Sequence, residues 1–195
     1  EYKSYNNYFH ITLSRKMGSI QKIKIPSSHY IGKNLWVIKR SNLNIGREIK
    51  FLSNLYEIIK EINSNNEEKK SSILVIQKYI EEPLLYCKRK FDMRIWVLFT
   101  YILKEGKYEV YVFKEGHLKA CSDVYDINSN DLFIHLTNYS VQKHNVNFSK
   151  TEIGNEISFE LFQNELNKNE KKINFKKDIF PKIVKIIGMT AHAVK

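Results

Sequence analysis

Alternation between charged and apolar residues at positions 90–95 constrains the fold of this chain more than any other feature. In the run Lys-Phe-Asp-Met-Arg-Ile every second side chain is charged and the others are apolar. This period of two predicts a β-strand with Lys90, Asp92 and Arg94 on one face, in a register fixed by burial of the other face. From the spacing alone, the charged face either holds a ribose hydroxyl and phosphates or is a solvated face with cross-strand ion pairs.

Apolar runs before this segment predict two further strands. The run at 73–76 is apolar and mostly β-branched, which is typical of a buried strand, and it delivers Gln77 and Lys78 to the strand's exit. The run at 35–38 predicts another buried strand, which ends at Lys39. An ammonium group at the end of a buried strand indicates an anionic partner.

Helical periodicity predicts three helices. The first is amphipathic and is indicated by apolar residues at Phe51, Leu52, Leu55, Ile58, Ile59 and Ile62. We expect a short second helix over 159–166. The third helix is expected over 179–194, with Asp178 as its N-cap and Pro181 in its first turn.

The middle of the chain is predicted to be rich in β-structure. Segments 95–103, 108–113 and 117–121 are expected to form a meander, joined by turns with the sequence Lys-Glu-Gly. The charged, Asn-rich segment 63–72 is expected to be a surface loop and the boundary between two lobes. Residues 1–24 carry no periodic signal.

Composition limits the class of protein. A chain of 195 residues with 43% hydrophobic content is expected to bury a real core as one domain or two small lobes. No apolar run approaches the roughly 20 residues needed to span a bilayer, and residues 1–7 lack the pattern of a signal peptide. Cys87 and Cys121 have neither metal-ligand spacing nor a disulfide framework around them, so we expect a reducing intracellular compartment.

The strong positive charge predicts an anionic partner. The net charge is +11 at pH 7, and a potential of this sign attracts nucleic acid, an anionic membrane or an acidic protein tail. Most aromatic residues lie within strand patterns, and no recognised nucleic-acid module is visible. We therefore expect neither a nucleic-acid nor a membrane partner.

Five short motifs occur in one order along the chain. They are Trp-Val-Ile-Lys at 36–39, Asn-Leu-Asn-Ile-Gly-Arg-Glu-Ile at 42–49, Gln-Lys-Tyr-Ile at 77–80, Lys-Phe-Asp-Met-Arg at 90–94 and His-Leu-Thr-Asn-Tyr-Ser at 135–140. In this order they resemble the tubulin tyrosine ligase-like family of ATP-grasp ligases, from about Ile25 to the C-terminus. The resemblance implies an α+β fold of the ATP-grasp type that lacks its C-terminal metal-binding segment, with one partial lobe over 1–72 and a truncated lobe over 73–195.

The resemblance also implies roles for individual residues. The residues expected to bind nucleotide are Lys39, Gly46, Arg47, Gln77, Lys78, Tyr79, Ile80, Lys90 and Asp92. Backbone groups near Tyr79 and Ile80 would contact adenine, Gln77 and Lys78 would point toward the base and phosphates, and the glycine loop would cover the phosphates.

The remaining site residues belong to the reaction itself. The residues expected to be catalytic are Arg94, Lys119, Thr137 and Asn138. Lys119 and Ser140 would hold the incoming amino acid. His135 is expected to be a satisfied structural histidine rather than a catalytic base.

The chemistry implied by the resemblance is ATP-dependent amide formation. A carboxylate of the protein substrate attacks ATP to give an acyl phosphate, and the amino group of a free amino acid displaces phosphate, with Mg²⁺ neutralising the triphosphate. The acceptor would be the glutamate-rich tail of tubulin, in the cytoplasm at microtubules, cilia or flagella. A polyglutamylase using free glutamate is the expected type, with a glycylase or tyrosine ligase as further options.

Several positions depart from the family pattern. Arg40 replaces a proline, Glu48 replaces a glycine, Lys119 replaces an arginine, and Glu156 stands where a lysine is typical. The Asp and Glu-x-Asn metal motif is absent, since the only acid beyond Glu170 is Asp178, and no metal ligand is therefore assigned. We expect a piece of a larger protein or a degenerate member, and the alternative function is an inactive module that binds acidic tubulin tails.

Overall fold

The computed structural model describes residues 32–67, 73–104, 107–168 and 172–193. The chain divides into two compact units, the first ending at Pro83 and the second beginning at Leu84. Both units combine helices with antiparallel sheet, so the predicted α+β class is confirmed. Within the described residues, no helix is both long enough and apolar enough to cross a membrane.

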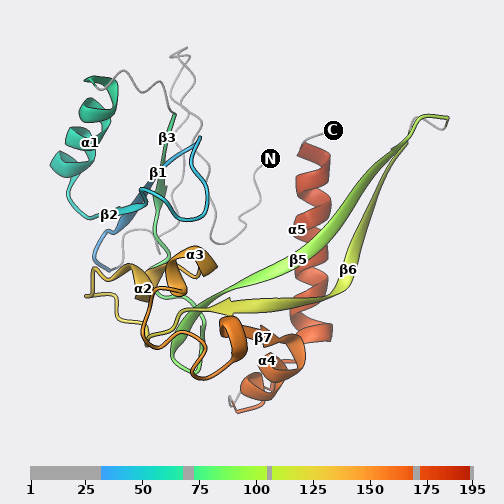
Figure 1. Cartoon of the computed structure of the whole chain (residues 1–195). Coiled ribbons are helices and arrows are strands. Elements are labelled where there is room, and N and C mark those ends of the chain that lie inside the picture. Colours follow the sequence, from blue (N-terminus) through green and yellow to red (C-terminus); the bar gives the residue numbers. More distant parts are fainter. Residues whose placement is uncertain (1–31, 68–72, 105–106, 169–171, 194–195) are drawn as a thin grey trace. The chain divides into compact units, whose positions relative to one another are not determined.

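The first unit is built on a sheet with the strand order β2-β1-β3. The central strand β1 (Trp36–Arg40) pairs antiparallel with β2 (Lys50–Leu52) and with β3 (Leu74–Lys78). Helix α1 (Leu55–Glu67) follows β2 directly (Figure 1). Among the described residues of this unit, the buried apolar ones are Leu35, Ile38, Ile58 and Tyr79.

The predicted first helix is confirmed, but its start at Phe51 was wrong. Phe51 and Leu52 lie in β2, where they pair with Val37 and Trp36, and the helix begins at Leu55. The side chain of Asn54 accepts a hydrogen bond from the Tyr56 amide (2.8 Å), which satisfies a donor of the first turn. Phe51 and Leu52 were assigned to the helix because their spacing from Leu55 also fits the helical period of 3.6 residues.

The boundaries of the predicted loop and of β3 also differ from expectation. The helix continues through 63–67, so the start of the loop predicted over 63–72 was wrong, and residues 68–72 lie outside the described part. The strand predicted at 73–76 runs instead from Leu74 to Lys78, so Gln77 and Lys78 lie inside it rather than at its exit. It is also less buried than expected, since none of its residues is fully buried and Ile76 is 36% exposed. The chain divides after Pro83 rather than after residue 72 because β3 pairs with β1, while the assignment of the units to ATP-grasp lobes stays a prediction.

The second unit is built on a sheet with the strand order β4-β5-β6-β7. Its strands are β4 (Leu85–Tyr86), β5 (Arg89–Ile102), β6 (Lys107–Ala120) and β7 (Glu156–Ser158). Its helical elements are α2 (Leu132–His135), α3 (Tyr139–Gln142), the 3₁₀ turn η2 (Ile153–Asn155), α4 (Phe159–Leu166), the π-helical turn η3 (Phe175–Ile179) and α5 (Phe180–Ala193). The distal half of the β5–β6 hairpin extends beyond the other strands as a two-stranded ribbon (Figure 1).

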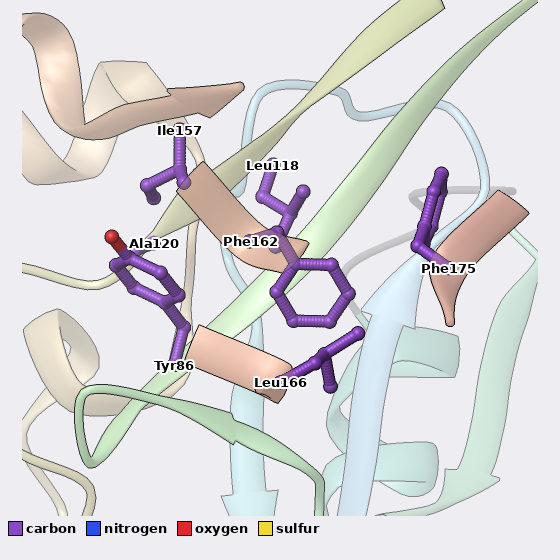
Figure 2. Close-up of a cluster of buried hydrophobic side chains, with 7 residues drawn as sticks. All are labelled: Tyr86, Leu118, Ala120, Ile157, Phe162, Leu166 and Phe175. Carbon is purple, nitrogen blue, oxygen red and sulfur yellow. The ribbon is translucent and has the colours of Figure 1, made fainter. Parts of the chain in front are cut away.

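One hydrophobic cluster holds this unit together. Figure 2 shows the cluster, in which Phe162 lies next to Leu118 and Leu166. Phe91 from β5 packs edge-on against Phe162, with ring centroids 5.2 Å apart. The apolar face predicted from the alternation at 90–95 is thus confirmed, and it fixes the register that sends the charged side chains to the opposite face.

The predicted meander is confirmed in its first hairpin, since β5 and β6 pair antiparallel as far as Ile102 and Lys107, but its second turn was wrong. A single long strand, β6, replaces the two expected strands, and the Lys-Glu-Gly sequence at 114–116 lies inside it rather than in a turn. The pairing of β5 with β6 shifts register between Ile95 and Val97, as at a β-bulge. A Cβ atom on Gly116 would lie 2.3 Å from the Arg94 carbonyl oxygen and 2.9 Å from the Phe159 ring, so the glycine serves a close approach.

The short helix predicted over 159–166 is confirmed as α4, with the Ser158 hydroxyl accepting from the Leu161 amide. The N-cap predicted for the last helix was wrong. The helical segment begins with η3, where the Asn174 side chain accepts from the Lys177 amide, and α5 continues it from Phe180. Asp178 instead accepts a hydrogen bond from the Asn174 amide (2.7 Å). The predicted end at residue 194 lies outside the described residues.

Candidate nucleotide and amino-acid site

In the second unit, the strand β5 and the motif at 135–140 are joined by side-chain hydrogen bonds. Lys90 Nζ donates to the carbonyl oxygen of His135 at 2.6 Å, and the Thr137 hydroxyl donates to the carboxylate of Asp92. Thr137 is 6% exposed. Two motifs that are 45 residues apart in sequence therefore form one polar cluster, while the roles expected of Lys90, Asp92 and Thr137 stay predictions.

Lys90 carries its positive charge in a site that solvent reaches poorly. Burial lowers the pKa of its ammonium, and the opposing effect of the nearby Asp92 carboxylate does not restore it to the ordinary value. A poorly solvated ammonium group is stabilised by an anion beside it, and Asp92 provides one in this structure.

His135 is a structural residue, as predicted. It is 1% exposed, and its Nε2 lies 2.7 Å from the Ser129 carbonyl oxygen. Burial lowers the pKa of the imidazole, and the nearby Lys90 cation adds to the effect, while the Ser129 contact opposes it. The ring contributes packing against Tyr125, and the backbone carbonyl contributes the contact to Lys90.

Gln142 positions the loop that carries Thr137, and nothing in the sequence singled it out. The side-chain amide donates to the carbonyl oxygens of Phe133 (2.9 Å) and Leu136 (2.5 Å), and its oxygen accepts from the Ser122 amide (2.8 Å). It is 1% exposed, so every polar atom needs such a partner. Glutamine is usually exposed, so nothing in the sequence indicated that Gln142 would be buried.

Asn138 and Ser140 lie beside this cluster, at the start of the short helix α3. Asn138 is the N-cap of α3, and its backbone carbonyl accepts from the Val141 and Gln142 amides, each at 2.9 Å. Its side chain makes no cap hydrogen bond, so the amide group is not used to begin the helix. Thr137, Asn138 and Ser140 thus lie on one short stretch beside the cluster, and the roles expected of them stay predictions.

Arg94 and Lys119 lie on the same charged sheet face. Lys119 is the cross-strand partner of Asp92, and Arg94 is the partner of His117. The Arg94 guanidinium carbon lies 5.7 Å from the centre of the Trp96 ring, a cation–π arrangement. Arg94 is exposed, so its side chain has room to reorient toward a ligand.

In the first unit, only part of the predicted set shares one face of the sheet. Gln77 pairs with Val37 and Lys39 pairs with Val75, which places Gln77 and Lys39 on the same face. Lys78 lies on the opposite face with Ile38. The expectation that Gln77 and Lys78 point the same way was wrong, because neighbouring residues in a strand alternate between faces.

Lys78 belongs to a buried ion pair. Its ammonium contacts the Glu81 carboxylate and donates to the Leu35 carbonyl oxygen at 3.1 Å, with the Lys78 and Glu81 side chains 9% and 8% exposed. Glu81 also accepts from the amides of Lys33 (2.6 Å) and Leu35 (2.7 Å). Burial raises the pKa of Glu81, but the hydrogen bonds from Lys78 and the two amides outweigh it and leave the pKa below its ordinary value.

The backbone amide of Tyr79, which was expected to contact adenine, already makes a hydrogen bond within the first unit. The Tyr79 amide donates to the Leu35 carbonyl oxygen at 2.9 Å, and the side chain is buried against Phe51. The Tyr79 amide is thus occupied within the sheet. Ile80 is 39% exposed, which suits the apolar wall that was expected of it.

The loop after β1 contains three residues in the left-handed region. Ile45, Gly46 and Glu48 have positive φ angles, of 55°, 81° and 53°. The Arg47 amide donates to the Asn44 carbonyl oxygen at 3.2 Å and is thus used within the loop. Arg47 is exposed on this loop.

Two of the departures from the family pattern contact each other. Arg40 Nε lies 2.7 Å from the Glu48 carboxylate, with side chains 12% and 53% exposed. The Glu48 carboxylate therefore forms an ion pair with Arg40, which lies in the same unit. The residues that replace proline and glycine form one interaction across the loop.

No metal centre is evident in the part of the chain that the structure covers. Among those residues, no group of three or more His, Cys, Asp or Glu side chains could hold an ion.

Comparison with known proteins shows the class to which this fold and these motifs belong. The family model described as "Tubulin-tyrosine ligase family" matches residues 5–195, and the chain belongs to this family. The chain is 36% identical over 179 residues to "Tubulin glycylase 3C" of Tetrahymena thermophila, covering 89% of this chain and 16% of that protein. It is 30% identical over 171 residues to "Protein monoglycylase TTLL8" of Homo sapiens, covering 84% of this chain and 19% of that protein. The chain thus spans less than a fifth of the length of these relatives.

The names of the relatives correct one expectation. A further human relative, "Tubulin monoglycylase TTLL3", is 33% identical over 112 residues, covering 57% of this chain and 14% of that protein. These relatives are named for transfer of glycine, so glutamate as the expected amino acid is not supported. The motifs predicted the family but not the amino acid, because the roles implied for Lys119 and Ser140 did not specify which amino acid these residues would hold.

Proposed function

We propose that this chain is part of an ATP-dependent ligase that joins glycine to tubulin. The observation that carries the proposal is the similarity to proteins named as glycylases, which extends over 84% and 89% of the chain for two of them. The acceptor would be a glutamate-rich tubulin tail, and the protein would act at microtubules. The net charge of +11 supports such an acceptor, since it attracts acidic chains.

The polar cluster of the second unit supports a nucleotide-binding role. ATP would supply the phosphoryl group that activates the acceptor carboxylate. Lys90 would hold a phosphate, because its poorly solvated ammonium favours an anion nearby. Asp92 would accept from a ribose hydroxyl in the way that it now accepts from Thr137, and Asn138 and Arg94 would contact the reacting groups.

The first unit, taken by itself, carries a second set of residues proposed to bind nucleotide. Lys39 and Gln77 share one sheet face, and the loop around Gly46 would cover the phosphates, with Arg47 adding charge. Ile80 would line the base. Lys78 would not contact the nucleotide itself. Its ion pair with Glu81 would instead hold the backbone of the two residues between them, Tyr79 and Ile80, in place.

A transfer assay tests the proposal. Full-length protein is incubated with microtubules, ATP, Mg²⁺ and radiolabelled glycine or glutamate. We expect incorporation of glycine that depends on ATP. Lys90→Ala should remove most of it, while Lys182→Ala, at an exposed position on α5, should not. Preferential incorporation of glutamate, or activity that persists without ATP, would contradict the proposal.

Thermal denaturation tests the nucleotide contacts without any transfer. A ligand at a hundredfold excess over its dissociation constant stabilises a protein by about 2.7 kcal/mol. ATP should therefore raise the melting temperature of the full-length protein, and Lys39→Ala and Lys90→Ala should each remove most of the shift. An equal shift in both variants and the wild type would place the nucleotide elsewhere.

A catalytically inactive module that binds acidic tubulin tails is the second candidate. Glu48 and Glu156 support it, because each brings a carboxylate to a region proposed to bind anions. In this case microtubules would bind in a salt-dependent manner, while ATP would change neither the melting temperature nor the tubulin.

A further inference from the structure

The charged face of the second unit carries two cross-strand rows. Asp92, Lys119 and Glu156 are register partners on β5, β6 and β7, and so are Arg94, His117 and Ser158. Side chains that are directly opposite each other, or two residues apart in a strand, share one face. The other face is buried in the core through Leu118 and Ile157, each 0% exposed, so the rows cannot slip to a different register.

Glu156 lies between two nitrogen atoms without a hydrogen bond to either. Its Oε1 is 3.6 Å from Lys119 Nζ and 3.5 Å from His117 Nε2, both beyond the usual length of a charge-assisted hydrogen bond. His117 Nε2 is buried and has no hydrogen-bond partner among the described residues. The carboxylate is 47% exposed, so strand register places it while its lone pairs stay accessible to a ligand.

We propose that Glu156 and Lys119 form a subsite for a zwitterionic amino acid whose side chain carries no charge. This subsite rests on the proposed function, and within it Glu156 is the group that selects which amino acid is transferred. Lys119 pairs with the carboxylate of the amino acid, and Glu156 accepts hydrogen bonds from its ammonium group. Both ends of glycine are thus matched by opposite charges that the sheet already holds side by side.

The charge of the face accounts for the selection. Glu156 is the acidic group of the pair, and its carboxylate is complementary to the ammonium group that every free amino acid carries. A donor whose side chain ends in a second carboxylate would bring that group close to Glu156, and like charges repel.

The test separates this subsite from the transfer reaction. In the full-length protein, Glu156→Gln keeps the size of the side chain and removes its charge. We expect the KM for glycine to rise about tenfold, as for loss of one charge-assisted hydrogen bond, with the KM for ATP unchanged. Glu156→Lys should increase incorporation of glutamate relative to glycine. Glu160→Gln, an exposed carboxylate on α4, is the matched control and should change neither.

Equilibrium dialysis with radiolabelled glycine provides a readout that does not need turnover. An active wild type with an unchanged glycine KM in Glu156→Gln would overturn the subsite and leave the proposed function standing. A wild type that binds glycine through Glu156 but transfers none would refute the proposed function and support the subsite. Absence of both binding and transfer would refute both, and a melting curve for each variant shows that it is folded.

Discussion

Replacement of Glu48 by glycine tests how the loop after β1 is stabilised. Glu48 has a φ angle of 53°, a left-handed conformation that costs a residue with a side chain about 1–2 kcal/mol. Glycine removes this cost. It also removes the ion pair with Arg40, which is worth only about 0.5 kcal/mol because Glu48 is 53% exposed.

The unfolded state supplies a third effect. Glycine gives the unfolded chain more freedom, which lowers stability by about 0.4–1 kcal/mol. These effects nearly cancel, so Glu48→Gly should change the free energy of unfolding by less than about 1 kcal/mol. Glu48→Ala keeps the strained backbone and loses the ion pair, so it should be less stable than Glu48→Gly by about 1 kcal/mol.

Urea denaturation of the full-length variants measures this difference, and an ATP titration accompanies it. ATP should bind Glu48→Gly as tightly as the wild type or more tightly, because a carboxylate is removed from the proposed phosphate loop. If the alanine variant is as stable as the glycine variant, the backbone at this position is not strained. Loss of ATP binding in Glu48→Gly would show that Glu48 is itself a ligand.

Other parts of the structure allow further predictions. Glu152→Gln should lower the free energy of unfolding by about 3 kcal/mol, because Arg89, 6% exposed, donates to both oxygens of Glu152 at 2.8 Å; a urea curve no different from that of Glu160→Gln would contradict this. The pKa of Glu81 is lowered in the folded protein. Glu81 therefore stabilises the fold above the ordinary glutamate pKa of about 4.3, and this stabilisation is lost as the pH falls through the pKa of Glu81 in the folded state. Acid titration of Glu81→Gln should therefore show a flatter loss of stability than the wild type. Binding to a glutamate-rich tail peptide should weaken with salt, since exposed charges are screened beyond about 8 Å at physiological ionic strength; microtubules without tails that still bind equally would refute this.

The alternation at 90–95 allowed a correct prediction because burial enforces it. Phe91 packs on the core phenylalanine Phe162, so a shift by one residue would bury Lys90 and Asp92 in the cluster. A pattern that the core enforces in this way can be recognised in the sequence alone. The same argument applied to adjacent strand residues would have separated Gln77 from Lys78 before the structure was known.

The errors occurred where one residue type serves two purposes. Glycine marks turns, but Gly116 is required by the nearby Phe159 ring and Arg94 carbonyl. Asx residues cap helices, and Asn174 and Asp178 both take part in beginning the same helical segment. Local sequence does not distinguish these uses. For Gly116 the deciding neighbours, Arg94 and Phe159, are distant in sequence. For Asn174 and Asp178, the cap depends on the residue at which the helical segment begins.

The contact between Arg40 and Glu48 changes what the departures from the family pattern mean. A lone carboxylate beside a triphosphate repels it, but a carboxylate 2.7 Å from a guanidinium acts as a dipole whose field falls off quickly with distance. Arg40→Met would keep much of the length of the side chain and leave the Glu48 charge uncompensated. We therefore expect Arg40→Met to weaken ATP binding and the double variant with Glu48→Gly to restore it. Equal weakening in the single and double variants would mean that Arg40 contacts the nucleotide directly rather than through Glu48.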